Sequence, residues 1–221
     1  MVKVVFFDLE TTGLDQDCDI IQIGAVSSQD NATFSTFILP NKPMSESAVA
    51  VTGVQYDCEK KTLFRVHDGR PIEAKSREEG FREFANFLRR IGNHGGVILV
   101  AHNCIQFDAP VLMSNLKEEN LLHEFKKLVY LFSDTFQEIK RRRNLPRYGS
   151  LSLQSIVKFY KLEHVYENLG LSLHDALGDA LAVKEIAKRI APGKKGVDWS
   201  LVGKKVDYYL WKDGVIAFPI K

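Results

Sequence analysis

The order of apolar and polar positions divides the chain into segments of strand and helix character. Val2–Asp8 is a short run of β-branched and aromatic residues, which predicts a buried strand that ends at the turn residues Thr12 and Gly13. Asp19–Ser27 and Thr33–Leu39 predict two further strands joined by a tight turn. Three consecutive strands with short connections predict an antiparallel meander.

Segments after the first three strands show the spacing of helices. Ser76 has Glu79 three residues later, the pattern of a capping box, and apolar residues then recur at helical spacing as far as Ile91. Residues 55–75 show no clear period and predict a long surface loop. Further helices are expected at Ser45–Val51, Ala109–Leu121, Asp134–Arg142, Leu151–Tyr160 and Asp175–Ile190, and further strands at Val97–Ala101 and Val129–Phe132. Strands that first meander and then alternate with helices predict an α/β fold with a mixed sheet between helices.

The C-terminal part has a different pattern. Pro192 and Gly193 end the last long helix. Tyr208–Trp211 and Val215–Pro219 then flank an Asp-Gly pair, which is a strong β-hairpin pattern. We therefore divide the chain into a domain of residues 1–192 and an extension of residues 193–221. The hairpin is expected either to dock a partner or to cover an apolar patch of the core.

Composition and charge limit the class of protein. The 221 residues are 45% hydrophobic and 10% aromatic, which indicates a globular protein with a core. The net charge is only +2, so contact with nucleic acid would depend on local charge and on metal ions. The three cysteines form no metal-binding or disulfide pattern. No segment approaches the ~20 apolar residues of a membrane span, and the first apolar run is too short for a signal peptide. We expect an intracellular protein, cytoplasmic or nuclear, that is not secreted and does not bind a membrane.

Two carboxylates stand at the end of the first strand. Asp8 and Glu10 are two residues apart, so both side chains project to the same face of the strand. Neighbouring anions repel each other unless a cation lies between them, and divalent cations with oxygen ligands suit such a pair. The alternative is a strand that simply leaves the core through a polar turn.

Two more acids and a histidine complete a candidate site. Asp108 stands where a helix begins, so a helix-capping role is the simple alternative. Asp179 lies on the apolar side of the last long helix, which is unfavourable unless the carboxylate is paired or binds metal. His174 lies at the start of the same helix, where it could act as a general base or be a partly exposed N-terminal histidine. All five residues lie at strand or helix ends, which fits one shared site.

Three segments carry a resemblance to a known family. Phe7–Leu14, Ala101–Asp108 and His174–Asp179 resemble, in order and spacing, the three motifs of the DEDDh 3′–5′ exonucleases, the family that includes proofreading subunits. The resemblance covers roughly residues 2–190. Three residues separate Asn103 from the Phe-Asp pair of the second motif, as in the three-prime repair exonucleases. The exonuclease domains derived from the ninth exon of the promyelocytic leukaemia protein belong near this branch.

The resemblance implies an RNase H-like fold, with a five-stranded mixed sheet between helices. It implies that Asp8, Glu10, Asp108 and Asp179 hold two Mg²⁺ ions, for which Mn²⁺ may substitute, with Asp8 bridging them. One ion would lower the pKa of the attacking water and the other would stabilise the leaving 3′ oxygen. His174 would accept the proton of the water. The product would be a nucleoside 5′-monophosphate.

Four further residues are candidates for holding the substrate. Leu14 directly follows the first motif, and the resemblance implies an apolar wedge against the 3′-terminal base; alternatively Leu14 packs the turn. Thr11 and Thr12 offer backbone N–H and hydroxyl groups to the terminal 3′-OH. Asn103 is expected either to contact the strand or to brace the second motif. The basic run Lys140–Arg143 would track phosphates or form a solvated helix end.

These observations favour an exonuclease acting on single-stranded or frayed 3′ ends of DNA. An enzyme that trims RNA 3′ ends is the alternative in the same class, because no sequence feature identifies the sugar. An inactive nucleic-acid-binding module is a third reading, disfavoured because all five catalytic residues are present. Thr33–Leu39 is a plausible edge strand and could pair with a second copy, but the sequence does not decide whether the protein is a homodimer.

Overall fold

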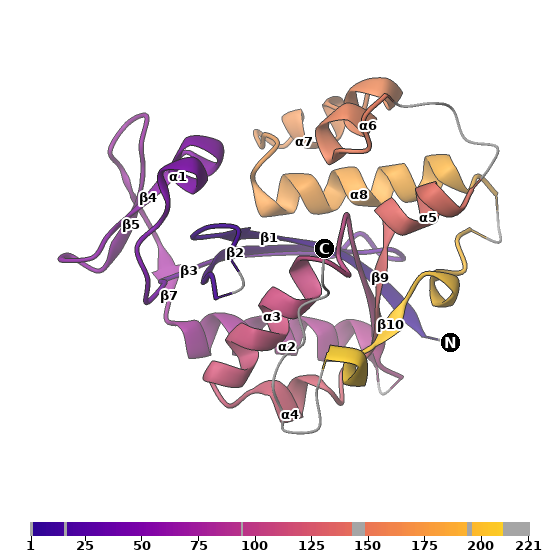
Figure 1. Cartoon of the computed structure of the whole chain (residues 1–221), viewed down its shortest axis with the longest axis horizontal. Coiled ribbons are helices and arrows are strands. Elements are labelled where there is room, and N and C mark those ends of the chain that lie inside the picture. Colours follow the sequence, from indigo (N-terminus) through magenta and orange to yellow (C-terminus); the bar gives the residue numbers. More distant parts are fainter. Residues whose placement is uncertain (1, 16, 94, 143–148, 194–195, 210–221) are drawn as a thin grey trace.

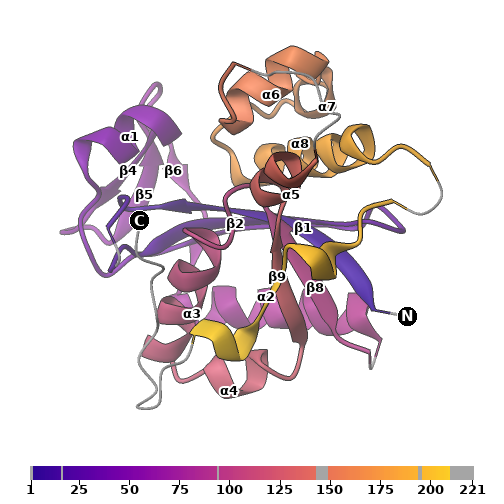
Figure 2. The same ribbon diagram turned by 45° about the vertical axis from the view of Figure 1, so that its right-hand side comes forward.

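A mixed sheet lies between two layers of helices in the computed structural model, which describes residues 2–15, 17–93, 95–142, 149–193 and 196–209. Helices α5–α8 cover one face of the sheet and α2–α4 cover the other (Figures 1 and 2). This arrangement confirms the α/β fold expected from the alternation of strand and helix patterns. Among the described residues, no helix combines the length and the apolarity needed to cross a bilayer.

The sheet has the strand order β10-β9-β8-β1-β2-β3-β7. Its strands are β1 (Lys3–Thr11), β2 (Ile20–Ser27), β3 (Thr33–Ile38), β7 (Ala74–Lys75), β8 (Val97–Ala101), β9 (Val129–Asp134) and β10 (Lys204–Lys205). The antiparallel meander of β1, β2 and β3 is confirmed, while β8 and β9 run parallel to β1. The five predicted strands form the centre, and the two-residue strands β7 and β10 extend each edge. Strand β3 is thus partly covered by β7, which pairs with Phe37 and Ile38.

The helices match the predicted ones at their centres and differ at their ends. They are α1 (Glu46–Thr52), α2 (Arg77–Gly92), α3 (Asp108–Glu118), α4 (Leu122–Phe125), α5 (Thr135–Arg141), α6 (Leu153–Tyr160), α7 (His164–Glu167) and α8 (Ala176–Ile190), with 3₁₀ turns at Trp199–Leu201 and Val206–Tyr209. The capping box of α2 is confirmed: Ser76 Oγ accepts the N–H of Glu79, and the Glu79 carboxylate accepts the N–H of Ser76. Helices α4 and α7 were not predicted, because four residues are too few to show a helical period.

The prediction of a surface loop at residues 55–75 is wrong. The segment contains β4 (Val54–Asp57), β5 (Thr62–Arg65) and β6 (Pro71–Ile72), which form a second antiparallel sheet, and then β7. Strands β4 and β5 have four residues each with one fully buried side chain, so the two-residue period of a strand could not show in the sequence. We call residues 46–72, which comprise α1 and this sheet, the arm; it projects from one end of the main sheet (Figure 1).

The central strand β1 separates the core into two sides. Val5, Phe7 and Leu9 pack with the apolar residues of α2 and α3 on one face. Phe6 packs with Ala180 and other residues of α8 on the opposite face. Because strand side chains alternate, Asp8 and Glu10 continue the row of Phe6 toward α8. The fold therefore places the half-buried Asp8 and the buried Glu10 between the centre of the sheet and its longest covering helix on that face.

The chain returns to the sheet after α8. Trp199 packs edge-on against Phe6, with ring centroids 5.9 Å apart, and Tyr209 packs edge-on against Phe132 at 5.6 Å. The predicted strand at Tyr208–Trp211 is not formed at Tyr208 and Tyr209, which lie in a 3₁₀ turn because the Tyr209 ring is buried against the core. The rest of the predicted hairpin lies outside the described residues. The division of the chain at residue 192 stays a prediction.

Candidate active site

The position of α8 is set by a glycine in the neighbouring strand. Gly24 pairs with Asp8 across β1 and β2. A Cβ atom on Gly24 would lie 2.1 Å from the carbonyl carbon of Ala176 and 2.1 Å from the nitrogen of Leu177. Only a glycine allows the first turn of α8 to rest on the strand at this distance. The first turn of α8, with Asp179, is thereby brought against the strand beside Asp8.

A buried amide fixes the rotation of the same helix. Gln22 pairs with Glu10 across the strands and is 2% exposed. Its Nε2 donates to Asp175 Oδ2 at 3.1 Å, and its Oε1 accepts the N–H of Ala176 at 3.2 Å. Asp175 also caps α8, since Oδ1 accepts the N–H of Leu177 at 3.0 Å. The start of α8 is therefore attached to the strand position opposite Glu10.

The third acid, Asp108, follows β8, the strand on the opposite side of β1 from β2. Asp108 is the first residue of α3, is 3% exposed, and follows the loop at the end of β8. This loop is held by the fully buried Asp134, whose carboxylate accepts the N–H groups of Asn103 at 3.0 Å and Ile105 at 3.1 Å. Phe107, not Asp108, is the N-cap residue of α3. The simple capping role considered for Asp108 is therefore not observed.

The four acids perturb one another. Burial raises the pKa of Glu10 to about 8, of Asp108 to about 8 and of Asp179 to about 7, and nearby carboxylates add to the effect in each case. The pKa of Asp8 lies well above its ordinary range, first because of burial and then because of the charges of Asp179, Asp108 and Glu10. Four carboxyl groups that share one buried region cannot all ionise without a compensating cation. The structure therefore brings the four predicted acids together at a place that favours positive charge.

His174 stands at the edge of this group. It has a φ of 66°, in the left-handed region, and its N–H donates to Asp179 Oδ2 at 3.3 Å. Partial burial lowers the pKa of its imidazole, so the neutral form that can accept a proton is favoured. The loop carrying His174 packs tightly on α8, since a Cβ on Gly178 would lie 2.5 Å from the carbonyl oxygen of Ser172. The histidine is thus held beside the acids by backbone contacts.

The donor atoms fit a divalent cation. One ligand atom from each of Glu10, His174 and Asp179 lies within 4.8 Å of the other two. Asp179 Oδ1 is buried and has no hydrogen-bond partner among the described residues. A buried carboxylate oxygen without a partner is unfavourable, and a metal ion would satisfy it. Two carboxylates and one imidazole are donor groups that divalent cations bind in proteins.

Comparison with protein families identifies the family of this chain. A family model described as Exonuclease matches residues 5–187, a range that contains all five predicted catalytic residues. The chain belongs to the exonuclease family. Membership implies dependence on divalent metal ions, in agreement with the donor set around Asp179. No curated protein sequence matches the chain.

Solved exonuclease structures share the fold. E. coli exonuclease I in complex with a dT13 oligonucleotide matches with a TM-score of 0.64 and 15% identity, over 86% of this chain and 41% of that chain. Another structure of exonuclease I matches with a TM-score of 0.66 and 15% identity, over 95% and 43%. A zinc-bound form of the E. coli enzyme with single-stranded DNA gives 0.62 and 16%, over 85% and 40%. The chain thus spans about two fifths of the length of these enzymes, and at this identity the likeness establishes the fold.

The predicted substrate residues of this exonuclease-family chain lie in two loops beside the acids. The Leu14 side chain is 83% exposed, so Leu14 does not pack the turn. Thr12 is buried, its N–H donates to the carbonyl of Asp19 at 2.8 Å, and its hydroxyl accepts the N–H of Asp19 at 2.9 Å. Thr11 Oγ1 donates to the carbonyl of Gly13 at 2.6 Å. In this structure the threonines shape the loop that presents Leu14, and their contact with the 3′-OH stays a prediction.

Asn103 has a φ of 64° and braces the second motif through its backbone. Its carbonyl accepts the N–H groups of Gln106 at 3.2 Å and Phe107 at 3.1 Å, while its own N–H donates to Asp134. The bracing role considered for Asn103 is therefore observed. Its contact with a nucleic-acid strand stays a prediction.

Sequence reasoning did not identify the residues that position this exonuclease-family site. Gln22, Gly24 and Asp134 act from neighbouring elements, and Asp175 stood in the third motif without an assigned role. Two signals were available: an amide and a glycine inside an otherwise apolar strand each indicate a close backbone approach or a buried hydrogen bond. The partner of each residue lies more than 25 positions away or in another element, so the sequence did not reveal it.

Proposed function

We propose that the chain removes nucleotides one at a time from the 3′ end of single-stranded or frayed DNA and releases nucleoside 5′-monophosphates. The observation that carries the proposal is the group of four mutually perturbed carboxyls with His174 beside them. Membership of the exonuclease family supports the reaction class. The similar fold of exonuclease I bound to dT13 and dA16 oligonucleotides supports a single-stranded DNA substrate.

In this proposal Asp8, Glu10, Asp108 and Asp179 hold two Mg²⁺ ions, which Mn²⁺ can replace. When bound, such ions supply positive charge to the scissile phosphate and acidify water. The side chains have distinct tasks. Asp8, whose pKa is raised by the charges of Asp179, Asp108 and Glu10, is assigned the position shared by both ions. His174, with its pKa lowered by burial, accepts the proton of the attacking water, and the hydrogen bond from its N–H to Asp179 sets its position.

The test uses oligonucleotides labelled at the 5′ end, single-stranded DNA and RNA of the same sequence, with Mg²⁺, Mn²⁺ or EDTA. We expect a ladder that shortens from the 3′ end, requires the metal and is abolished in Asp179→Asn. Glu185→Gln serves as the control, because it removes one carboxylate charge from the same helix at a residue that pairs with the exposed Lys188. If neither polymer is shortened by the folded protein with metal, the enzyme assignment fails and an inactive binding module remains.

The same experiment decides the alternative substrate. Faster shortening of RNA than of DNA would make the chain an RNA 3′-trimming exoribonuclease. The mechanism would stand, because the carboxylates and His174 act on a phosphodiester that both polymers contain. The DNA assignment rests on the oligonucleotides bound in the exonuclease I structures and not on a contact to the sugar in this chain.

Four finer assignments accompany this proposal. We place the chain near the three-prime repair exonucleases and the promyelocytic-leukaemia-protein exon-9-like domains, on the spacing of the second motif. Residues 1–192 form the catalytic domain and 193–221 an extension, which the family match to residues 5–187 supports.

The three free thiols support an intracellular location, cytoplasmic or nuclear. Strand β3 leaves Thr33–Thr36 without a partner on its β7 side, where a second copy could pair to form a homodimer.

A further inference from the structure

The arm begins at the active-site loop. Ser45, the N-cap residue of α1, donates its N–H to the carbonyl of Thr12 at 2.8 Å. A Cβ on Gly13 would lie 3.6 Å from Ser45 Oγ, so α1 starts in contact with the residue before Leu14. Helix α1 then leads away from the catalytic carboxyls toward the second sheet (Figure 1).

The arm is fixed to the catalytic sheet. Val54 of β4 and Leu63 of β5 pack with Ile21 of β2, and all three are buried. Ile21 is adjacent to Gln22, which holds α8, so the arm and the active site are built on the same strand. Strand β7 then joins the main sheet directly after β6. The arm therefore keeps a defined position beside the acids.

The exposed side of α1 is uncharged along most of its length. Ser47, Ala50 and Val51 are exposed and recur at helical spacing, and the one acid of the helix, Glu46, lies in its first turn. Val51 is 51% exposed. At the far end, the N–H of Val66 donates to the carbonyl of Gly53 at 2.9 Å, and Val66 is 49% exposed. We call the exposed apolar side chains of Leu14, Ala50, Val51 and Val66 the strip; α1 connects its two ends, since Ser45 bonds Thr12 and Gly53 bonds Val66.

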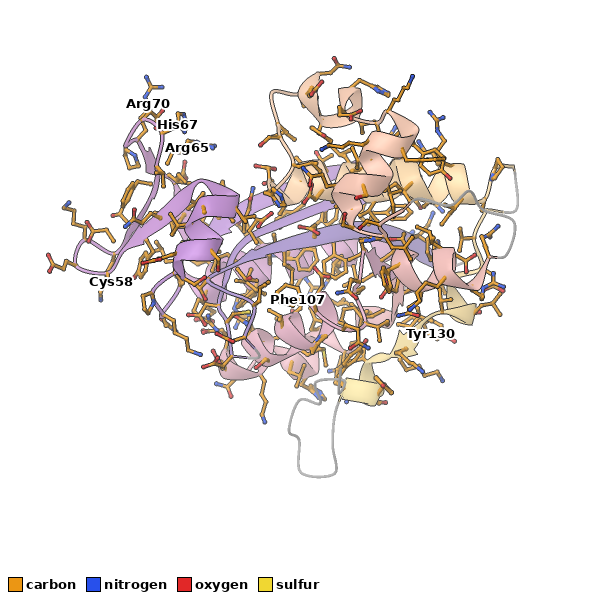
Figure 3. All side chains as sticks on the ribbon, turned by 45° about the horizontal axis from the view of Figure 1, so that its top comes forward. Cys58, Arg65, His67, Arg70, Phe107 and Tyr130 are labelled. Carbon is orange, nitrogen blue, oxygen red and sulfur yellow. The ribbon has the colours of Figure 1, made fainter. Side chains whose placement is uncertain are left out.

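Cations stand at the end of this strip. The turn carries Arg65, His67 and Arg70, which Figure 3 shows together at one end of the arm, with Cys58 at the other end. The Arg70 side chain is 83% exposed and that of His67 is 72% exposed. The N–H of Arg65 donates to the carbonyl of Arg70 at 2.9 Å, so both arginines lie on the same turn. Asp68 lies 3.6 Å from Arg70 and compensates part of this charge.

The other basic run near the site is already paired. Arg141 and Arg142 lie 2.8 Å and 2.6 Å from the fully buried carboxylate of Glu138. The single negative charge of Glu138 therefore compensates one of these two positive charges within the protein. The rest of that run, from position 143, lies outside the described residues. Arg65 and Arg70 are exposed cations on the turn where the strip ends.

We propose that the arm is a second binding site for the substrate strand. The bases that follow the 3′-terminal nucleotide, toward the 5′ end, lie along Leu14, Val51 and Val66, and Arg65 and Arg70 bind a phosphate beyond them. Apolar contacts to bases with cations for the backbone are the usual means of holding single strands. This inference rests on the proposed function, because it takes the 3′ end to lie at the carboxyls.

The length of α1 sets how many nucleotides a strand needs to reach the arginines. The seven residues of α1 span about 10 Å, which corresponds to about three stacked nucleotides. A trinucleotide whose 3′ end lies at the acids therefore ends near Val51 and does not reach the arginines. A strand of sixteen nucleotides reaches them. The contribution of Arg65 and Arg70 should consequently depend on substrate length.

The experiment compares Arg65→Gln/Arg70→Gln with the matched control Lys60→Gln/Lys61→Asn, which removes two cations from the opposite turn of the arm. Binding of 5′-fluorescein dT16 and dT3 is measured by anisotropy in EDTA, where hydrolysis cannot occur, at several salt concentrations. We expect the arginine variant to raise the Kd for dT16 about tenfold. The slope of log Kd against log salt concentration should fall by about 0.7, because the contact with one phosphate is lost. The lysine variant should stay within about twofold of wild type.

Three results would overturn the inference: an unchanged Kd and salt slope in the arginine variant, an equal loss for dT3 and dT16, or an equal loss in the lysine variant. Circular dichroism and melting temperature establish that each variant is folded. Shortening of dT16 by the wild type with Mg²⁺ is measured in parallel. Shortening without an arginine effect refutes the arm site alone, whereas an arginine effect on binding without shortening by the wild type refutes the proposed function alone.

Discussion

The backbone of Ala176 lies against Gly24, so close that a Cβ on Gly24 would be 2.1 Å from the Ala176 carbonyl carbon. Gly24→Ala must therefore push α8 off the sheet or unfold its first turn, and both displace Asp179. We expect a loss of stability of at least about 2 kcal/mol in denaturant unfolding and a loss of activity larger than the stability change explains. Gly95→Ala is the control, because its Cβ would meet Gly92 at an ordinary 3.5 Å. Equal stability and activity in the two variants would show that α8 adjusts freely.

The acid cluster should make the metal-free protein sensitive to pH. A carboxyl whose pKa is raised on folding stabilises the protein fully below its unfolded pKa, near 4, and this stabilisation is lost as the pH rises through the folded value. For Glu10, Asp108 and Asp179 the folded values are about 8, about 8 and about 7. The melting temperature in EDTA should therefore fall between about pH 4 and pH 8.

Asp179→Asn should reduce this slope. Asp179 makes the largest charge contribution to the raised pKa values of both Asp8 and Glu10, so its removal relieves repulsion at high pH. At pH 8 in EDTA we expect the variant to melt about 2–4 °C or more above wild type, while Mg²⁺ stabilises only the wild type appreciably. Differential scanning calorimetry at pH 5 and pH 8 checks this. A variant that melts lower than wild type at pH 8 without metal would contradict the charge argument.

His174 should act on the proton and not on the metal. His174→Gln is expected to lower kcat by about 10²–10⁴ and to leave the Mn²⁺ midpoint of thermal stabilisation within about twofold. His174 also lies close enough to Glu10 and Asp179 to bind the same metal ion. A large shift of the Mn²⁺ midpoint would make His174 a metal ligand instead of a general base. His164→Gln, an exposed histidine bonded to the carbonyl of Lys161, serves as the control and should keep full activity.

Leu14 should matter for substrate and not for stability. Its side chain is 83% exposed, so Leu14→Ser should leave the melting temperature unchanged. If Leu14 is a wedge, burying it against the terminal base contributes about 1.5–3 kcal/mol, and the KM on a duplex with a frayed 3′ end should rise about tenfold or more. Leu201→Ser, 60% exposed and on the C-terminal segment, is the matched control. The same KM in both variants would show that Leu14 does not act as a wedge.

A buried ion-pair network supports the loop that carries Leu14. Arg77 Nη1 lies 2.8 Å from Asp19 Oδ1, with both side chains at most 4% exposed, and Asp19 holds Thr12 through its backbone. Arg77→Met leaves the Asp19 carboxylate buried without its cation and should destabilise the protein by about 3–5 kcal/mol. Adding Asp19→Asn should recover part of that loss, and Arg82→Met, at an exposed pair, should cost under about 1 kcal/mol. Urea denaturation of wild type, Arg77→Met, Asp19→Asn and the double variant gives the coupling energy of the pair, and additive losses would show that the pair is not coupled.

Long periodic segments made the central fold predictable. The runs that became β1, β2, β3 and β8 and the capping box of α2 express local preferences over enough residues for the strand or helix period to appear. The second sheet of the arm was missed because β4 and β5 each have four residues with one buried side chain. Their stability comes from packing on Ile21, a contact between distant positions that no local period records.

The sequence by itself determined the kind of chemistry. Asp8, Glu10, Asp108, Asp179 and His174 could be identified because their order and spacing follow those of a known set of motifs. Only the tertiary structure decided how these groups act together. The contact of Ala176 with Gly24 and the bonds of Gln22 to Asp175 bring α8 to the strand, and burial then raises the carboxyl pKa values. Desolvation and charge repulsion depend on distances between side chains from separate elements, and those distances exist only after the chain has folded.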